Sequence, residues 1–155
     1  MVTPPDIPFD AIWTALTDRF RLGPDSLHGP DHWQRVEQNG LRLARATEGS
    51  DLVVVRLFAV FHDSRRLNEG FDPDHGPAAA KSVRKRQGDW FTLTEWQLET
   101  LCLACRDHAE GLVSDDPTIG CCWDADRLDL PRVGIPSHRD LMSTAVGKSL
   151  ATIQR

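Results

Sequence analysis

Apolar residues recur along most of the chain at the three- and four-residue spacing that is typical of amphipathic helices. Asp51 stands directly before one apolar run and is the expected N-cap of its helix. No segment alternates between apolar and polar residues over the length of a strand, so the pattern predicts an all-α fold. The predicted helices span about 10–20, 31–48, 51–63, 75–87, 95–110 and 121–130, with a loop and a weak terminal helix after Pro131.

The length of 155 residues predicts one domain over 1–155. The longest apolar stretch, Leu52 to Phe61, contains Arg56 and is about half as long as the roughly 20 residues of a membrane-spanning helix. The first residues, MVTPPDIPFD, carry neither the basic nor the apolar region of a signal peptide. We therefore expect a cytoplasmic protein with no membrane partner.

Composition adds that the chain is globular and mildly acidic. Hydrophobic residues make up 40% of it, and 18 Lys and Arg stand against 23 Asp and Glu for a formal net charge of −5. No nucleic acid is expected as a partner, because this balance offers phosphate backbones no general attraction. We interpret the charged face of the fourth helix, formed by Lys81, Arg84, Lys85 and Arg86, as solvated. Four tryptophans are interpreted as core residues, namely Trp33, Trp90, Trp96 and Trp123.

Four cysteines raise the question of a structural zinc site. Cys121 and Cys122 are adjacent, which is not the spacing that turns two thiolates toward one tetrahedral ion. We therefore expect Cys102, Cys105, Cys121 and Cys122 to be buried thiols in a reducing compartment.

Histidine and aspartate residues occur on successive predicted helices, inside the second and sixth helices, at the ends of the third and fifth, and at the start of the fourth. A buried polar group must be hydrogen-bonded, paired or metal-bound, because an unsatisfied one costs about 1–3 kcal/mol. A single histidine on an apolar face is an ordinary core residue, whereas several converging on one place indicate a metal. The residues concerned are His32, the pair His62 and Asp63, His75, His108 and Asp126.

The order and spacing of these residues form a recognisable series of motifs. They are HGPDHWQRV at 28–36, LFAVFHDSRR at 57–66, DHGPAAA at 74–80, CRDHAEG at 105–111 and DADRLD at 124–129. This series resembles the HD-domain superfamily of metal-dependent phosphohydrolases. The resemblance covers about residues 28–130, which leaves 131–155 as a C-terminal extension, and it implies a helical bundle with a metal site between the helices.

The resemblance implies a primary metal site made by His32, His62, Asp63 and Asp126. Asp126 is chosen over Asp124 because the last ligand of the family directly precedes a basic residue. Neutral imidazoles and carboxylates suit a divalent transition metal such as Mn, Fe, Ni, Co or Zn.

The superfamily also has members with two metal ions, and their additional histidines match His75 and His108 in this chain. The resemblance thus implies one or two ions of this kind; with two, Asp63 would bridge them, and His75 and His108 would hold the second. The alternative for His75 is a residue that opens a helix and binds substrate or solvent.

His28 precedes His32 by four residues, where phosphodiesterases of the superfamily place the histidine that protonates the leaving group. It is therefore a candidate general acid, or else a surface residue of the loop. With an unperturbed pKa near 6.5, a histidine could hold such a proton close to neutral pH.

Arg65 and Arg66 directly follow the HD pair, where guanidinium groups could bind phosphate oxygens. Alternatively they pair with carboxylates of the following loop, namely Glu69, Asp72 or Asp74. Arg66 stands where some HD phosphatases carry a glutamate that positions water, and Glu69 or Asp129 could replace that glutamate.

The function that these predictions favour is hydrolysis of a phosphomonoester or phosphodiester in a small phosphorylated substrate, a nucleotide or another molecule. A minority of the superfamily instead uses a di-iron centre to activate oxygen, which is the second hypothesis. The third is a non-catalytic sensing module that keeps its metal as a structural element. The substrate and the oligomeric state stay open.

Overall fold

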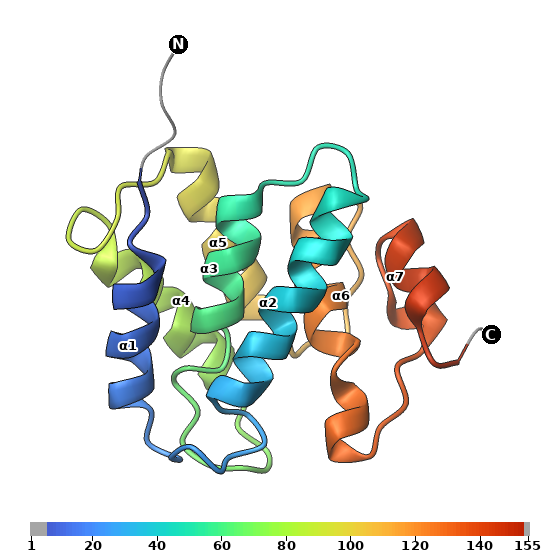
Figure 1. Ribbon diagram of the computed structural model, residues 1–155, viewed down its shortest axis with the longest axis horizontal. Helices are drawn as coiled ribbons and strands as arrows, with labels where there is room; N and C mark the ends of the chain where they lie inside the picture. Colours follow the sequence, from blue (N-terminus) through green and yellow to red (C-terminus); the bar gives the residue numbers. More distant parts are fainter. Residues whose placement is uncertain (1–5, 154–155) are drawn as a thin grey trace.

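A computed structural model describes residues 6–153, which form a bundle of helices (Figure 1). The described residues contain no β-strand, only two isolated bridges, so the all-α prediction is confirmed. The ends of the predicted 1–155 domain, residues 1–5 and 154–155, lie outside the described residues. The helices are α1 (Phe9–Arg19), α2 (Pro30–Arg45), α3 (Leu52–Phe61), α4 (His75–Arg86), α5 (Glu95–Asp107), α6 (Pro117–Arg127) and α7 (Ala145–Leu150), with short 3₁₀ turns at Leu130–Val133 and Arg139–Leu141.

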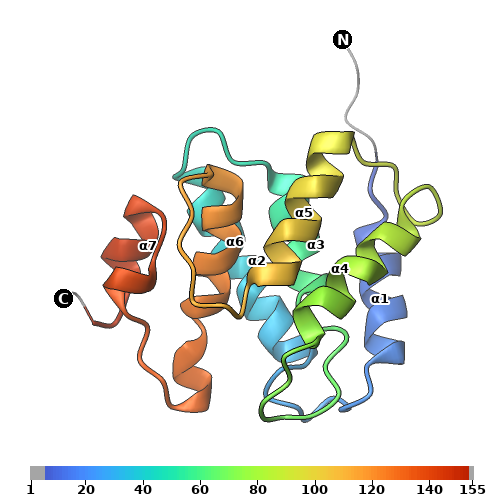
Figure 2. The same cartoon turned by 180° about the vertical axis from the view of Figure 1, so that it is seen from behind.

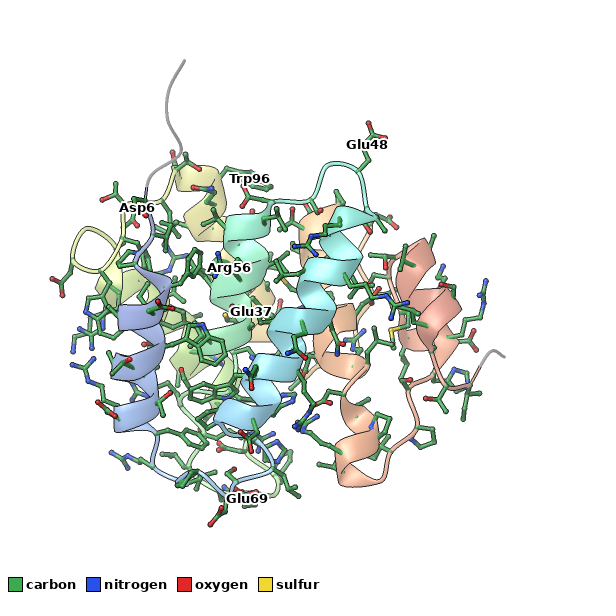
Figure 3. All side chains as sticks on the ribbon, in the orientation of Figure 1. Asp6, Glu37, Glu48, Arg56, Glu69 and Trp96 are labelled. Atoms are coloured by element: carbon green, nitrogen blue, oxygen red, sulfur yellow. The ribbon has the colours of Figure 1, made fainter. Side chains whose placement is uncertain are left out.

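Helix α3 is the centre of the bundle. It packs against α1, α2, α4, α5 and α6, and every residue from Leu57 to Phe61 is buried. A helix that is apolar on all sides has to be surrounded in this way. Its one charged residue, Arg56, places its guanidinium over the Phe9 ring at 3.6 Å from the centroid and its Nε 3.7 Å from Glu37 Oε2 (Figure 3).

Capping residues determine where the helices begin. The Asp51 carboxylate accepts a hydrogen bond from Val54 N, as predicted. Thr94 and Gln97 form a capping box at the start of α5. Helix α6 begins at Pro117, four residues before the predicted start, because Asp116 caps it and Pro117 occupies its first turn.

Several helix ends meet at one end of the bundle, the lower end in Figure 1. The N-termini of α2 and α4 lie there with the C-termini of α3 and α5 (Figures 1 and 2). Residues 108–116 then run back along the bundle, so that α6 also ends there (Figure 2). All the candidate ligands belong to these converging ends, which explains how motifs far apart in sequence come together.

Two expectations about single side chains differ in outcome. All four cysteines are free and buried, as predicted. Trp33 and Trp123 are buried and Trp90 packs against the core, but the prediction for Trp96 is wrong, since half of this residue is exposed. It lies at the end of the bundle opposite Glu69 (Figure 3). Among residues 6–153, no helix is long and apolar enough to cross a membrane.

Candidate metal centre

Four predicted ligands converge between α2, α3 and α6. His32 Nε2 lies 3.1 Å from His62 Nε2 and 3.1 Å from Asp126 Oδ1. Asp63 Oδ2 lies 3.3 Å from His32 Nε2 and 3.4 Å from His62 Nε2. His32, His62 and Asp63 are buried, and Asp126 is partly buried. One donor atom from each residue therefore faces a common point.

A second group shares Asp63 with the first. His75 Nε2 and His108 Nε2 are 2.9 Å apart, and each lies 3.2 Å from Asp63 Oδ1. One carboxylate oxygen thus faces the first histidine pair and the other faces the second. The short loop between Asp63 and His75 is held by Asp72, whose carboxylate accepts a hydrogen bond from Leu67 N.

The orientation of each imidazole is determined by its other ring nitrogen. The Nδ1 atoms of His62, His75 and His108 each contact a backbone carbonyl three residues earlier, at Ala59, Asp72 and Cys105. Because a carbonyl only accepts hydrogen bonds, each Nδ1 carries a proton and each Nε2 is the nitrogen that faces the site. This is the orientation in which histidine binds a metal through Nε2, in place of any proton there.

The distances and charges of this donor set fit divalent metal ions. Ligand bonds of about 2.1 Å at the angles of an octahedron or tetrahedron separate neighbouring donor atoms by roughly 3.0–3.4 Å. The donor–donor distances in both groups lie close to that range. Nitrogen lone pairs and carboxylates that face one another also require a cation between them.

The pKa values of the clustered residues also indicate that the site favours a positive charge. Burial alone lowers the pKa of His32, but hydrogen bonds with Asp126, Asp129 and Asp63 raise it to about 9. Against the same burial effect, the charge of Asp63 and a hydrogen bond with Asp126 raise the pKa of His62 to about 10. Burial alone would raise the pKa of Asp63, but these histidines hold it well below its usual range. The pocket therefore attracts positive charge.

A comparison with solved structures finds a protein with a similar fold. The chain superposes with a TM-score of 0.71 on the crystal structure of a protein described as a predicted HD superfamily hydrolase from an uncultured Thermotogales bacterium. The alignment covers 91% of this chain and 81% of that one, at 24% sequence identity. The chain has an HD-type fold. No family model and no curated protein matches the sequence.

Within the HD-type fold, the two aspartates of the DADRLD segment face opposite ways. Asp126 contributes to the ligand cluster. Asp124 is fully buried and accepts hydrogen bonds from Ser143 N, Thr144 N and the Thr144 hydroxyl. The choice of Asp126 over Asp124 therefore agrees with where the two carboxylates lie.

Asp129 and Glu69, the two carboxylates suggested as replacements for the missing glutamate, both make hydrogen bonds to other residues. Asp129 Oδ2 lies 2.6 Å from His32 Nδ1, and its carboxylate also accepts from Arg35 Nε. Glu69 accepts hydrogen bonds from the Ser26 hydroxyl and from Leu27 N. Asp129 thus orients a predicted ligand, while Glu69 joins two loops at this end of the HD-type bundle (Figure 3).

His28 is buried, so the alternative of a surface loop residue is wrong. Its Nδ1 accepts a hydrogen bond from Arg132 Nη2 and lies 3.9 Å from Asp63 Oδ2. Its Nε2 lies 3.0 Å from the Glu69 carbonyl and therefore donates to it. Burial, followed by the charge of Arg66, lowers the pKa of His28. The structure thus favours a neutral ring whose proton is held at Nε2.

The two arginines after the HD pair differ in environment. Arg66 donates to the Asn68 and Gly70 carbonyls, and its Nε lies 3.6 Å from Asp63 Oδ1. Arg65 is exposed. Neither makes the alternative pairing with Glu69, Asp72 or Asp74 within the described residues.

Some contacts at this centre have no signal in the sequence. Arg132 lies 104 residues after His28, and no motif links the two positions. The Asp129 contact with His32 spans 97 residues, although Asp129 does stand inside the DADRLD motif. A general expectation that metal-binding histidines have carboxylate partners would have singled out Asp129.

Proposed function

We propose that this protein is a metal-dependent phosphohydrolase that cleaves a phosphomonoester or phosphodiester of a small molecule. The observation that supports the proposal is the position of Asp63, whose two oxygens face two separate histidine pairs. His32, His62, Asp63 and Asp126 would hold one divalent transition ion, and Asp63, His75 and His108 a second. Bound ions of this kind polarise phosphoryl oxygens and lower the pKa of water.

The surrounding residues have separate parts in the proposed reaction. Arg66, with Nε 3.6 Å from Asp63 Oδ1, is placed to bind the phosphoryl oxygens beside the cluster. Arg65 is exposed next to it and can reach the same substrate from outside. Fixed guanidinium groups stabilise charge that accumulates on the phosphoryl group.

His28 is the candidate proton donor to the leaving group, although its proton is held at Nε2 by the Glu69 carbonyl. To act as an acid, it has to release that carbonyl or accept a second proton in exchange for the Arg132 contact at Nδ1. A small movement of the loop that carries Glu69 would accomplish the first, and displacement of Arg132 would accomplish the second. Acid catalysis by His28 thus requires a change at one of these two contacts.

A di-iron oxygenase is the second candidate, because a carboxylate between two histidine pairs suits two iron ions as well. The third is a sensing module with a structural metal. Oxygen consumption by the iron-loaded protein, without phosphate release, would favour the oxygenase. Stoichiometric metal with neither activity would favour the module.

The first experiment measures metal content and phosphate-ester hydrolysis in the wild type and Asp63→Ala. After loading with Mn²⁺ or Fe²⁺, mass spectrometry should find two ions per chain in the wild type and almost none in the variant, because Asp63 contributes to both groups. Hydrolysis of p-nitrophenyl phosphate or bis(p-nitrophenyl) phosphate should disappear with the metal. Circular dichroism confirms that the variant stays helical. Unchanged hydrolysis in Asp63→Ala would refute the proposal.

A further inference from the structure

A second concentration of charge lies beside the metal centre. A cavity of about 170 Å³ is formed by the end of α1, the residues after α3, and α4. We call it the arginine pocket, because five of its lining residues are Arg19, Arg21, Arg65, Arg66 and Arg86. The other lining residues are leucine and serine, so no carboxylate lines it.

The protein's own acidic groups neutralise this charge only weakly. The nearest carboxylates are Asp63, 3.6 Å from Arg66 Nε, and Asp89, 3.9 Å from Arg86 Nη1. Arg66 and Arg86 each keep a buried Nε–H without a hydrogen-bond acceptor in the described part of the chain. Gathering five weakly neutralised arginines costs self-repulsion even in a chain with a net charge of −5, and an anionic ligand would relieve it.

Two of the arginines are held in place by one aromatic ring. The guanidinium carbons of Arg86 and Arg19 lie 4.1 Å and 5.1 Å from the centroid of the Trp90 ring. Cation–π contacts of this kind fix side chains that would otherwise move freely. Less conformational entropy is therefore lost when a ligand binds, which favours affinity.

The arginine pocket adjoins a larger cavity on one side and the metal centre on the other. Arg65 and Ser82 also line a neighbouring cavity of about 480 Å³, together with Lys81 and Lys85, where Asp74 is the one acidic residue. On the other side, Arg66 contacts both the pocket and Asp63. The pocket is smaller than the roughly 300–1,000 Å³ of a site for a whole small molecule. It therefore suits one compact, multiply charged group, with room outside for the rest of a ligand.

We propose that the arginine pocket binds a phosphate-type anion with several charges, of the diphosphate class. Planar guanidinium groups match phosphate oxygens in paired hydrogen bonds, and five of them can engage a group that carries many such oxygens. If the proposed function holds, a ligand bound there lies beside the metal centre, so the pocket would select substrates with a second phosphate. The binding itself does not depend on that activity.

The test is calorimetric titration of inorganic pyrophosphate into the full chain in the presence of EDTA, which keeps metal ions from binding the anion. The wild type should bind, and Arg19→Gln/Arg21→Gln should bind at least about tenfold more weakly. Neither residue belongs to the metal centre. Arg19→Lys/Arg21→Lys should give an intermediate affinity, because charge remains but the paired hydrogen bonds are lost.

The matched control is Arg42→Gln/Arg45→Gln, which removes the same charge from two exposed arginines of α2 that do not line the pocket. Its affinity for pyrophosphate should stay within about twofold of the wild type. Equal weakening in both double variants, or no binding by a wild type that is folded by circular dichroism, would overturn the proposal.

A second titration, with a nucleoside diphosphate in the same buffer, identifies the source of the anion. Tighter binding than pyrophosphate, lost in Arg19→Gln/Arg21→Gln, assigns the pocket to the diphosphate of a nucleotide. Equal binding assigns it to the anion alone. Pyrophosphate binding without any phosphate-ester hydrolysis would support the pocket while rejecting the proposed function.

Discussion

The contact between His32 Nδ1 and Asp129 Oδ2 determines how one predicted ligand faces the metal centre. The two atoms are 2.6 Å apart, and Arg35 holds the same carboxylate from the solvent side. A carboxylate partner fixes the ring, keeps the proton on the far nitrogen and makes the near nitrogen a better ligand. Asp129 is therefore a positioning residue for the metal.

Asp129→Asn should weaken metal binding by about 10–100-fold, because an amide neither carries the charge nor fixes the ring of His32 as firmly. Competition with a fluorescent chelator measures the dissociation constant directly. Arg35→Gln is the control. Arg35 is partly exposed and donates to both carboxylate oxygens of Asp129, which keeps its charge when Arg35 is replaced, so the loss of Arg35 should change the affinity by a few-fold at most. Equal effects of the two variants would contradict this role for Asp129.

Single residues also mark how far the sequence predicts this site. The motif spacing named six ligand candidates, and the structure brings all of them into two adjoining groups. The motif spacing could not reveal the carbonyl partners of the outer nitrogens of His62, His75 and His108, because backbone carbonyls have no sequence signature. Nor could it reveal the arginine pocket, since Arg19 and Arg86 meet only through packing on Trp90.

At the scale of elements, α4 and α5 cross with their backbones almost in contact. A Cβ atom on Gly76 would lie 2.5 Å from the Arg106 carbonyl oxygen and 2.9 Å from that of Cys105. Gly76 follows His75, and Cys105 is the residue whose carbonyl orients His108. The close crossing therefore determines the distance between these two histidines.

Gly76→Ala should destabilise the protein by about 1–3 kcal/mol, because backbone atoms have to move to admit the methyl group. It should also lower the metal content from two ions per chain toward one, by separating His75 from His108. Urea denaturation and metal analysis measure the two effects. Gly70→Ala is the control, since the nearest atom to its added Cβ would be 3.6 Å away. Full stability of Gly76→Ala would show that the helices can separate without cost.

The helix pattern in the sequence predicted these elements well where the signals are local. Asp51 and Thr94 act as caps where the pattern expects a helix to begin. The start of α6 was missed, because Asp116 and Pro117 lie in a polar stretch that resembles a loop until the cap is seen. Trp96 was misplaced because its exposure depends on what the rest of the bundle leaves uncovered.

At the scale of the whole molecule, Asp124 joins the C-terminal segment to the bundle. Its carboxylate accepts three hydrogen bonds from Ser143 and Thr144, and Thr144 in turn caps α7. Arg127, on the same helix, donates to the Leu141 carbonyl. Helix α6 therefore carries a metal-site residue and the anchor of the C-terminal segment side by side.

Asp124→Ala should lower the free energy of unfolding by about 2–3 kcal/mol, because it leaves buried donors without an acceptor. Hydrogen exchange should rise first over residues 137–151. Asp124→Asn retains one acceptor oxygen, so its effect should be smaller. Global destabilisation without any local increase in exchange would contradict the proposed anchoring.

The way the histidines are oriented has a consequence for how this centre withstands mutation. His62, His75 and His108 rely on the carbonyls of residues 59, 72 and 105, and every amino acid has such a carbonyl. Substitutions at residues 59 and 105 can therefore accumulate over evolutionary time without turning a ligand away, provided the helices persist, whereas the Asp72 side chain also holds its loop through Leu67 N. His32 alone among the four has its outer nitrogen held by a side chain, that of Asp129. Among these orienting contacts, a substitution at position 129 would therefore weaken metal binding most readily.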